Sequence, residues 1–230
     1  MNPILLAAQP TARSGRTVKQ LELDTDIRAA LTQRIITALE SSAQGSTAQL
    51  RGSLAEEKAD AYSDIDIFWE IPDDLFQESV DRVRDVLSVS HPVESLRSAP
   101  DFQNSDRRRL FFVLFKDISL FWRADIDVFA LSVQRNFEYD VNNEAARGND
   151  WSLPQSALMN AISAVKALLR HENDIAEQLL VRGFERVGLS IPEGNTKELI
   201  LKLTEGVVAL DSSQEGFARR VVDLHRDAFG

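Results

Sequence analysis

Residues Leu50–Glu70 read LRGSLAEEKADAYSDIDIFWE, and this stretch decides how the rest of the chain is interpreted. The pair Gly52-Ser53 follows a short apolar approach, and a polar connection then leads to two aspartates that alternate with isoleucines. Successive side chains of a β-strand point to opposite faces, so Asp64 and Asp66 project to the same side, roughly 7 Å apart. The pattern therefore predicts a strand that directs two carboxylates at one spot.

Two carboxylates this close raise each other's pKa, and a divalent cation is the usual way to keep both ionised. The pair Asp64 and Asp66 thus predicts a magnesium site. Glycine lets a backbone approach a ligand closely, and turn amides with a serine hydroxyl suit a phosphate oxygen. Gly52 and Ser53 are accordingly predicted to bind the phosphates of a nucleotide beside the metal.

The spacing of these residues resembles the signature of the polymerase-beta-like nucleotidyltransferase superfamily. Gly52-Ser53 is followed, 64 − 53 = 11 positions after the serine, by Asp-Ile-Asp-Ile. The resemblance implies an α+β fold, in which a small mixed β-sheet with flanking helices forms the nucleotidyltransferase domain. It also implies a third acidic residue on a later, neighbouring strand.

The candidate for that third strand is Ile118–Leu131, ISLFWRADIDVFAL. Asp125 and Asp127 share one face of such a strand by the same period of two. Members of the family usually show one aspartate followed by a hydrophobic run, and Asp127 matches this better than Asp125. We predict Asp64, Asp66 and Asp127 as catalytic metal ligands, with Asp125 as the alternative to Asp127. The preceding run Arg107–Arg109 is interpreted mainly as a solvated face.

The amino-acid composition excludes some classes of function. The chain has 230 residues and a formal charge of −10, and it contains no cysteine. The absence of cysteine excludes disulfides, zinc-thiolate sites and thiol nucleophiles. The acidity argues against a nucleic-acid partner, because such a protein normally presents a basic surface. No apolar run is long enough for a membrane span, and we expect a cytoplasmic protein.

Periodicity predicts two domains. Residues 1–148 would form the catalytic domain, with 1–23 as an irregular lead-in and a helix that begins at Asp24 or Thr25 with an apolar stripe Ile27, Leu31, Ile35 and Leu39. Residues 149–230 show four amphipathic helical segments with short connections, which predicts a C-terminal helical bundle.

This two-domain plan resembles the aminoglycoside (kanamycin-type) nucleotidyltransferases. That the C-terminal helical bundle binds the substrate is implied by this resemblance. The resemblance implies that a lysine in the first helix of the bundle contacts the nucleotide phosphates, and Lys166 stands at the matching place. A solvated helix lysine is an equally good interpretation of that residue. The resemblance also permits a homodimer, and it implies a glutamate base, for which Glu138 and Glu144 are candidates without a motif that selects either.

The function predicted from these features is magnesium-dependent transfer of AMP from ATP, or of another nucleotide from its triphosphate, to a hydroxyl of a small molecule, with release of pyrophosphate. An aminoglycoside is one candidate acceptor. The alternative is a non-catalytic nucleotide- or protein-binding module of the same fold, such as a partner in a toxin–antitoxin pair.

Overall fold

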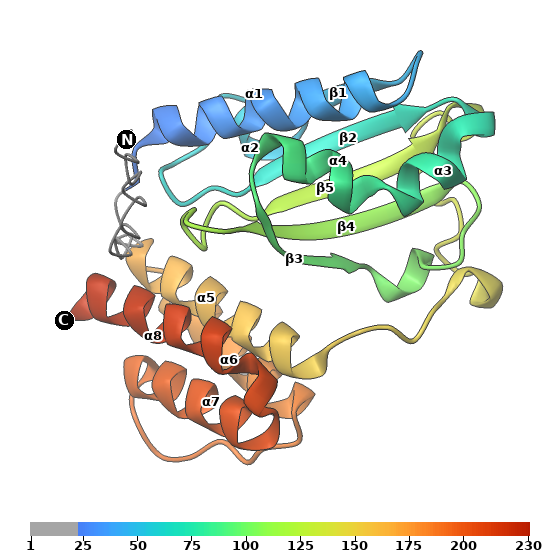
Figure 1. The fold of residues 1–230 in the computed structure, drawn as a ribbon. Coiled ribbons are helices and arrows are strands. Elements are labelled where there is room, and N and C mark those ends of the chain that lie inside the picture. Colours follow the sequence, from blue (N-terminus) through green and yellow to red (C-terminus); the bar gives the residue numbers. More distant parts are fainter. Residues whose placement is uncertain (1–22) are drawn as a thin grey trace, which may run out of the picture.

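The computed structural model describes residues 23–230, so the predicted lead-in lies, apart from Leu23, outside the described residues. The fold is α+β, as predicted: a five-stranded mixed sheet with flanking helices is followed by C-terminal helices (Figure 1). The strands are β1 (Thr47–Leu50), β2 (Ile65–Ile71), β3 (Val93–Ser98), β4 (Arg108–Phe115) and β5 (Ala124–Ala130). The α-helices are α1 (Thr25–Ser42), α2 (Gly52–Ala55), α3 (Phe76–Asp81), α4 (Val83–Ser90), α5 (Leu153–Leu169), α6 (Asn173–Arg186), α7 (Thr196–Leu210) and α8 (Glu215–Phe229).

The order of the strands in the sheet is β1-β2-β5-β4-β3. The two central strands β2 and β5 run parallel, and the other neighbouring pairs are antiparallel. In the β2–β5 register Asp66 pairs with Asp125, and Phe68 pairs with Asp127. Because paired residues share a face of a sheet, all acidic residues of these two strands point to the same side.

The other side of the sheet is apolar and is covered by helices. Ile65, Ile67 and Trp69 of β2 are fully buried and belong to the same core as Leu31 and Ile35 of α1. Figure 1 shows α1, α3 and α4 on one side of the sheet and the helices α5–α8 on the other. The apolar face of β2 is thereby packed against α1, while its polar face is turned toward the C-terminal helices.

The first helix begins where the sequence predicts it. The carboxylate of Asp24 accepts a hydrogen bond from the amide of Asp26, which caps α1. Leu31, Ile35 and Leu39 are fully buried, but Ile27 is 46% exposed, so its place in the predicted stripe is wrong. Ile27 lies in the first turn of α1, where Arg28 is buried instead.

The third motif strand is shorter than predicted, since β5 spans only Ala124–Ala130. Residues Ser119–Trp122 form a turn with a hydrogen bond from the Trp122 amide to the Ser119 carbonyl. The solvated interpretation of the arginine run is wrong for two of its members: Arg108 and Arg109 are buried. Both lie in β4, where hydrogen bonds to backbone carbonyls compensate their burial.

Four helices follow the sheet, as predicted, and α5 packs against the other three. Asn195 and Glu198 form a capping box at the start of α7. Polar contacts attach the bundle to the sheet and its loops; among them Arg170 binds Asp60, Gln155 donates to Ser95, and Arg220 binds Glu94. No helix within residues 23–230 is long and apolar enough to span a membrane.

Candidate functional site

A cluster of carboxylates lies on the polar face of the sheet, where β2 and β5 run side by side. Asp64 immediately precedes β2, and Asp66 is its second residue. Asp125 pairs in register with Asp66, whereas Asp127 lies two pairs further along, beside Phe68. The structure therefore brings Asp64, Asp66 and Asp125 together, and it places Asp127 deeper in the sheet.

Basic side chains separate these carboxylates from one another. Arg123 forms a bidentate pair with Asp125, and its Nη2 also lies 3.7 Å from Asp64 Oδ2. Lys166 of α5 lies near the other oxygen of the same carboxylate, with 3.7 Å between Nζ and Asp64 Oδ1. The predicted lysine thus reaches the carboxylate cluster.

Arg51 lies between the two remaining carboxylates. Its guanidinium is 3.9 Å from Asp66 and 3.8 Å from Asp127, and it stacks 4.9 Å from the centre of the Phe68 ring. These distances are longer than hydrogen bonds, so Arg51 supplies charge without fixing either carboxylate. Arg51 can therefore turn toward a ligand at small cost.

Asp127 has a different environment from the other three carboxylates. Its side chain is 3% exposed, and both of its oxygens accept hydrogen bonds from Arg108, which is itself buried. The Arg108 guanidinium also donates to the carbonyl of Phe137 and stacks 4.0 Å from the centre of the Phe102 ring. Asp127 is thus half of a buried ion pair within the sheet.

Burial and mutual repulsion shift the titration of the cluster. Burial, followed by the charges of Asp64 and Asp125, raises the pKa of Asp66 to about 6. Burial also raises the pKa of Asp125, although Arg123 opposes this, and burial lowers the pKa of Lys166. The charge of Asp64 contributes to the raised pKa of both Asp66 and Asp125, and carboxylates perturbed in this way are typical of functional sites.

Gly52 forms the edge of this site. Its φ of +62° is a left-handed conformation, and a Cβ built there would lie 2.7 Å from Asp66 Oδ2. Any other residue would push the carboxylate away. Ser53 follows as the second residue of the four-residue helix α2, half-buried beside the cluster. The backbone of Gly52 thus lies close to Asp66, and the binding of a phosphate by Gly52 and Ser53 stays a prediction.

Gly52→Ala is expected to destabilise the protein by about 2–4 kcal/mol, because it combines backbone strain with a clash against Asp66. Gly188→Ala is the matched control: Gly188 has φ +68°, but no atom lies within 4 Å of the place that a Cβ would occupy there. That control is expected to cost about 1 kcal/mol. Urea denaturation of both variants measures the difference, and equal losses would show that the Asp66 contact is unimportant.

The carboxylate oxygens on these adjacent strands are of the ligand type that magnesium prefers. Asp64 and Asp66 are the residues available for such an ion, while both oxygens of Asp125 are bound by Arg123. Within residues 23–230 no three acidic, histidine or cysteine side chains converge closely enough to hold a metal ion as they stand. Asp125 can join Asp64 and Asp66 only if the Arg123 side chain turns aside.

Arg51, Arg108 and Arg123 are the site residues that sequence reasoning missed. Arg123 stands two positions before Asp125, so the period of two that groups the aspartates also places it on their face. That signal was available in the sequence. The pairing of Arg108 with Asp127 depends on the order of β4 and β5 in the sheet, which no local pattern gives.

The two candidate bases Glu138 and Glu144 are exposed residues of the connection between β5 and α5.

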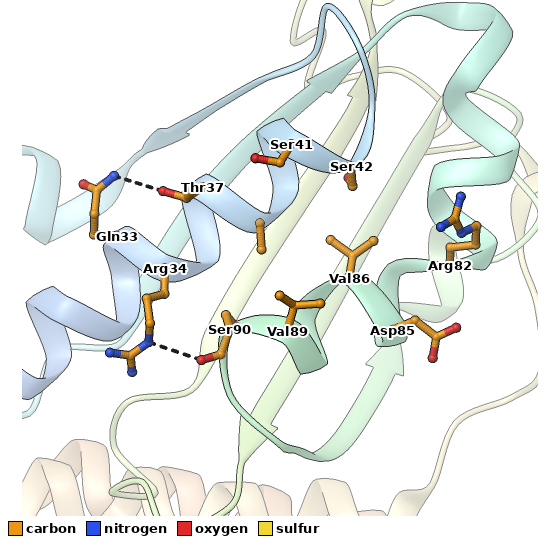
Figure 2. Close-up of a pocket in the computed structure, with 11 residues that line it drawn as sticks. Gln33, Arg34, Thr37, Ser41, Ser42, Arg82, Asp85, Val86, Val89 and Ser90 are labelled. Carbon is orange, nitrogen blue, oxygen red and sulfur yellow. Dashed lines mark hydrogen bonds between the residues drawn. The ribbon is translucent and has the colours of Figure 1, made fainter.

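A groove lies on the opposite side of the sheet from the carboxylate cluster, between α1 and the segment Arg82–Ser90 (Figure 2). This groove of about 560 Å³ contains Arg34, which donates to the carbonyl of Ser90, together with Arg82 and Asp85. Its lining includes a single carboxylate among the described residues. The groove therefore offers no grouping of reactive side chains comparable with the cluster on the polar face.

No protein-family model matches the sequence, and a comparison with curated proteins finds no significant match. Among solved structures, the chain is similar to one described as the structure of the GLD-2/RNP-8 complex. The identity is 13%, the TM-score is 0.34, and the match covers 83% of this chain and 74% of the other. A TM-score this low does not establish a common fold, and the function proposed below depends on the site alone.

Proposed function

We propose that this protein is a magnesium-dependent nucleotidyltransferase that moves a nucleoside monophosphate, AMP in the first instance, from its triphosphate to a hydroxyl of a small molecule. The observation that carries the proposal is the grouping of Asp64, Asp66 and Asp125 on one face of two adjacent parallel strands. Such a group is costly to maintain in a fold that does not use it, because each carboxylate disfavours ionisation of the next.

Each residue has a separate task in this proposal. Asp64 and Asp66 hold the metal, and Gly52 and Ser53 receive the phosphates beside it. When bound, magnesium would neutralise phosphate charge and lower the pKa of the attacking hydroxyl. Lys166 lies against Asp64 and supplies a further positive charge toward the leaving pyrophosphate.

The reaction itself forms one bond and breaks one. The acceptor oxygen bonds to the α-phosphorus, and the bond from that phosphorus to the oxygen bridging to the β-phosphate breaks, so that pyrophosphate leaves with the electron pair. The hydroxyl proton passes to Asp125, whose raised pKa makes it a better proton acceptor than an ordinary carboxylate. Arg123 must first release Asp125, and it then remains near the negative charge of the transition state.

The test is calorimetric binding of ATP and the other nucleoside triphosphates, with magnesium and with EDTA. We expect magnesium-dependent binding in the wild type and at least tenfold weaker binding in the double variant Asp64→Asn/Asp66→Asn, because two ligand charges are lost. Asp174→Asn, at an exposed position of α6, is the control and should bind like the wild type. Unchanged binding in the double variant, with an unchanged circular dichroism spectrum, would refute the assignment.

One observation favours a second candidate, a nucleotide- or protein-binding module without transfer. Each carboxylate of the site already has a basic partner, namely Lys166 and Arg123 for Asp64, Arg51 for Asp66, Arg123 for Asp125 and Arg108 for Asp127. A site neutralised in this way does not require a metal to be stable. Nucleotide binding that is indifferent to EDTA, with no pyrophosphate released, would support this candidate.

A further inference from the structure

Arg97 of β3 completes a row of side chains across the polar face of the sheet. In the register of the four strands, Asp66 pairs with Asp125, Asp125 with Phe112, and Phe112 with Arg97. These four residues therefore share one face. Arg97 stands at one end of the row, and the carboxylates stand at the other.

Arg97 differs from the other basic residues of this face because it has no acidic partner. Within residues 23–230 no carboxylate lies within 4.0 Å of its guanidinium, and its buried Nη1 has no hydrogen-bond partner. Two aromatic rings flank it instead: its central carbon lies 4.4 Å from the centre of the Trp151 ring and 6.0 Å from that of Phe112. Leaving a charged donor buried and unpaired is costly unless a ligand satisfies it.

The charges around Arg97 are also of the wrong sign to stabilise it. Burial, together with the positive charges of Arg123 and Arg186, lowers its pKa to about 10, although the charge of Asp125 opposes this. The group is still charged at neutral pH. Arg186 donates to Ser156, and Arg123 is already shared between Asp125 and Asp64. This end of the row therefore carries more positive than negative charge.

The strand order places Arg97 on the acceptor side of the site. The Gly52-Ser53 turn follows β1, and β1 and β3 are the two edges of the sheet. If the phosphates of the nucleotide lie at Gly52-Ser53, as the proposed function has it, then Arg97 lies across the carboxylates from them. A planar guanidinium with a stacked aromatic ring is well suited to a carboxylate or phosphate group.

We infer that Arg97 binds an oxyanion of the acceptor, so that the acceptor is a hydroxy compound bearing a phosphate or carboxylate group rather than a polycationic aminoglycoside. The inference deepens the proposed function and depends on it for the assignment to the acceptor. The anion site itself rests only on the surroundings of Arg97. Trp151, which caps the guanidinium, then forms one wall of the acceptor pocket.

The first measurement is calorimetric titration of the metal-free protein, in EDTA, with inorganic phosphate, malate and kanamycin. We expect phosphate and malate to bind the wild type and to bind Arg97→Met at least tenfold more weakly. Arg182→Met removes the same charge from an exposed position of α6 and should bind both anions like the wild type. Equal anion binding by Arg97→Met and Arg182→Met, or preferential binding of kanamycin, would overturn the inference.

The fluorescence of Trp151 provides a second measurement, which can be made without any substitution of Arg97. Phosphate should change the tryptophan fluorescence of the wild type and leave that of Trp151→Phe unchanged, because the other tryptophans, Trp69 and Trp122, are buried elsewhere in the core. The same phosphate-induced change in both proteins would place the anion elsewhere and refute the site.

A competition experiment separates the two sources of the anion. If the acceptor supplies it, saturating magnesium and ATP should leave phosphate binding unchanged, and Arg97→Met should bind ATP normally. Competition between ATP and phosphate, with ATP binding weakened by Arg97→Met, would assign Arg97 to the nucleotide and overturn the acceptor assignment. Phosphate binding at Arg97 in a protein that binds no nucleotide would refute the proposed function and leave the anion site intact.

Discussion

Asp66→Asn is expected to abolish magnesium-dependent transfer and, in the same variant, to raise the free energy of unfolding of the metal-free protein at pH 8. The two effects have one cause. The buried Asp66 carboxylate serves as a metal ligand in the proposed reaction, but its charge lies near those of Asp64 and Asp125 and therefore destabilises the folded protein. Asparagine keeps the shape of the side chain and removes the charge. We expect transfer to fall at least about 100-fold, because the loss of a residue that only orients a metal ligand already costs about 10–100-fold.

The sign of the stability effect follows from the pKa of Asp66. Its value of about 6 in the folded protein exceeds the value of about 3.9 that an unfolded chain shows. Stability from this group is therefore fully present below about pH 4 and is lost as the pH rises through about 6. At pH 8 the variant should be more stable than the wild type by about 1–3 kcal/mol, and at pH 4 the difference should vanish. Urea denaturation in EDTA at the two pH values measures this.

Asp60→Asn is the control of opposite sign. The bidentate pair with Arg170 holds the pKa of Asp60 below its ordinary value, so its stabilisation is present above about pH 4 and is lost as the pH falls further. This variant should therefore be less stable than the wild type at pH 8. A destabilised Asp66→Asn at pH 8 would contradict the interpretation that repulsion among Asp64, Asp66 and Asp125 opposes folding.

The local patterns of the sequence predict much of the fold. The period of two places Asp64 and Asp66 on one face and the isoleucines between them in the core, where Ile65 and Ile67 are fully buried. The helical period gives α1, and the aspartate before it gives the cap. These features depend on residues a few positions apart, so the sequence alone contains what determines them.

The charge partners of the site could be predicted only in part, because most of them are brought together by the sheet. Arg51 reaches Asp127 across 76 positions only because β1, β2 and β5 are neighbours (127 − 51 = 76). Arg108 is buried for the same reason, since β4 lies beside β5 and pairs it with the buried carboxylate of Asp127. A run of three arginines shows no such environment by itself. The distinction between Asp125 and Asp127 likewise depends on the register of two strands and not on the hydrophobic run after either residue.

Asp125→Asn and Asp127→Asn are expected to differ strongly, both in stability and in activity. Asp127→Asn leaves the Arg108 guanidinium buried against Phe102 without its carboxylate, and removing one partner of a buried pair costs about 3–5 kcal/mol. Part of this cost is offset, because burial raises the pKa of Asp127 and so disfavours the charge that the substitution removes. Asp125→Asn leaves Arg123 with a second carboxylate, Asp64, at 3.7 Å. We therefore expect Asp127→Asn to be the less stable variant by at least about 1 kcal/mol in urea denaturation.

Activity should show the reverse order when it is measured at a temperature where both variants are folded. Asp125→Asn removes the carboxylate beside Asp66 and is expected to reduce transfer at least 100-fold, while Asp127→Asn is expected to retain most of it. The double variant Arg108→Met/Asp127→Asn is the control, because it removes the unpaired charge and should recover part of the stability lost by Asp127→Asn. A different result would contradict this expectation: Asp127→Asn is folded and inactive, while Asp125→Asn retains normal activity. Asp127 would then be the third acidic residue of the site, and pairing with Asp66 in the sheet would not identify that residue. In the proposed reaction it is the position relative to Asp66 that separates the two residues, since burial, an arginine partner and a raised pKa are common to both.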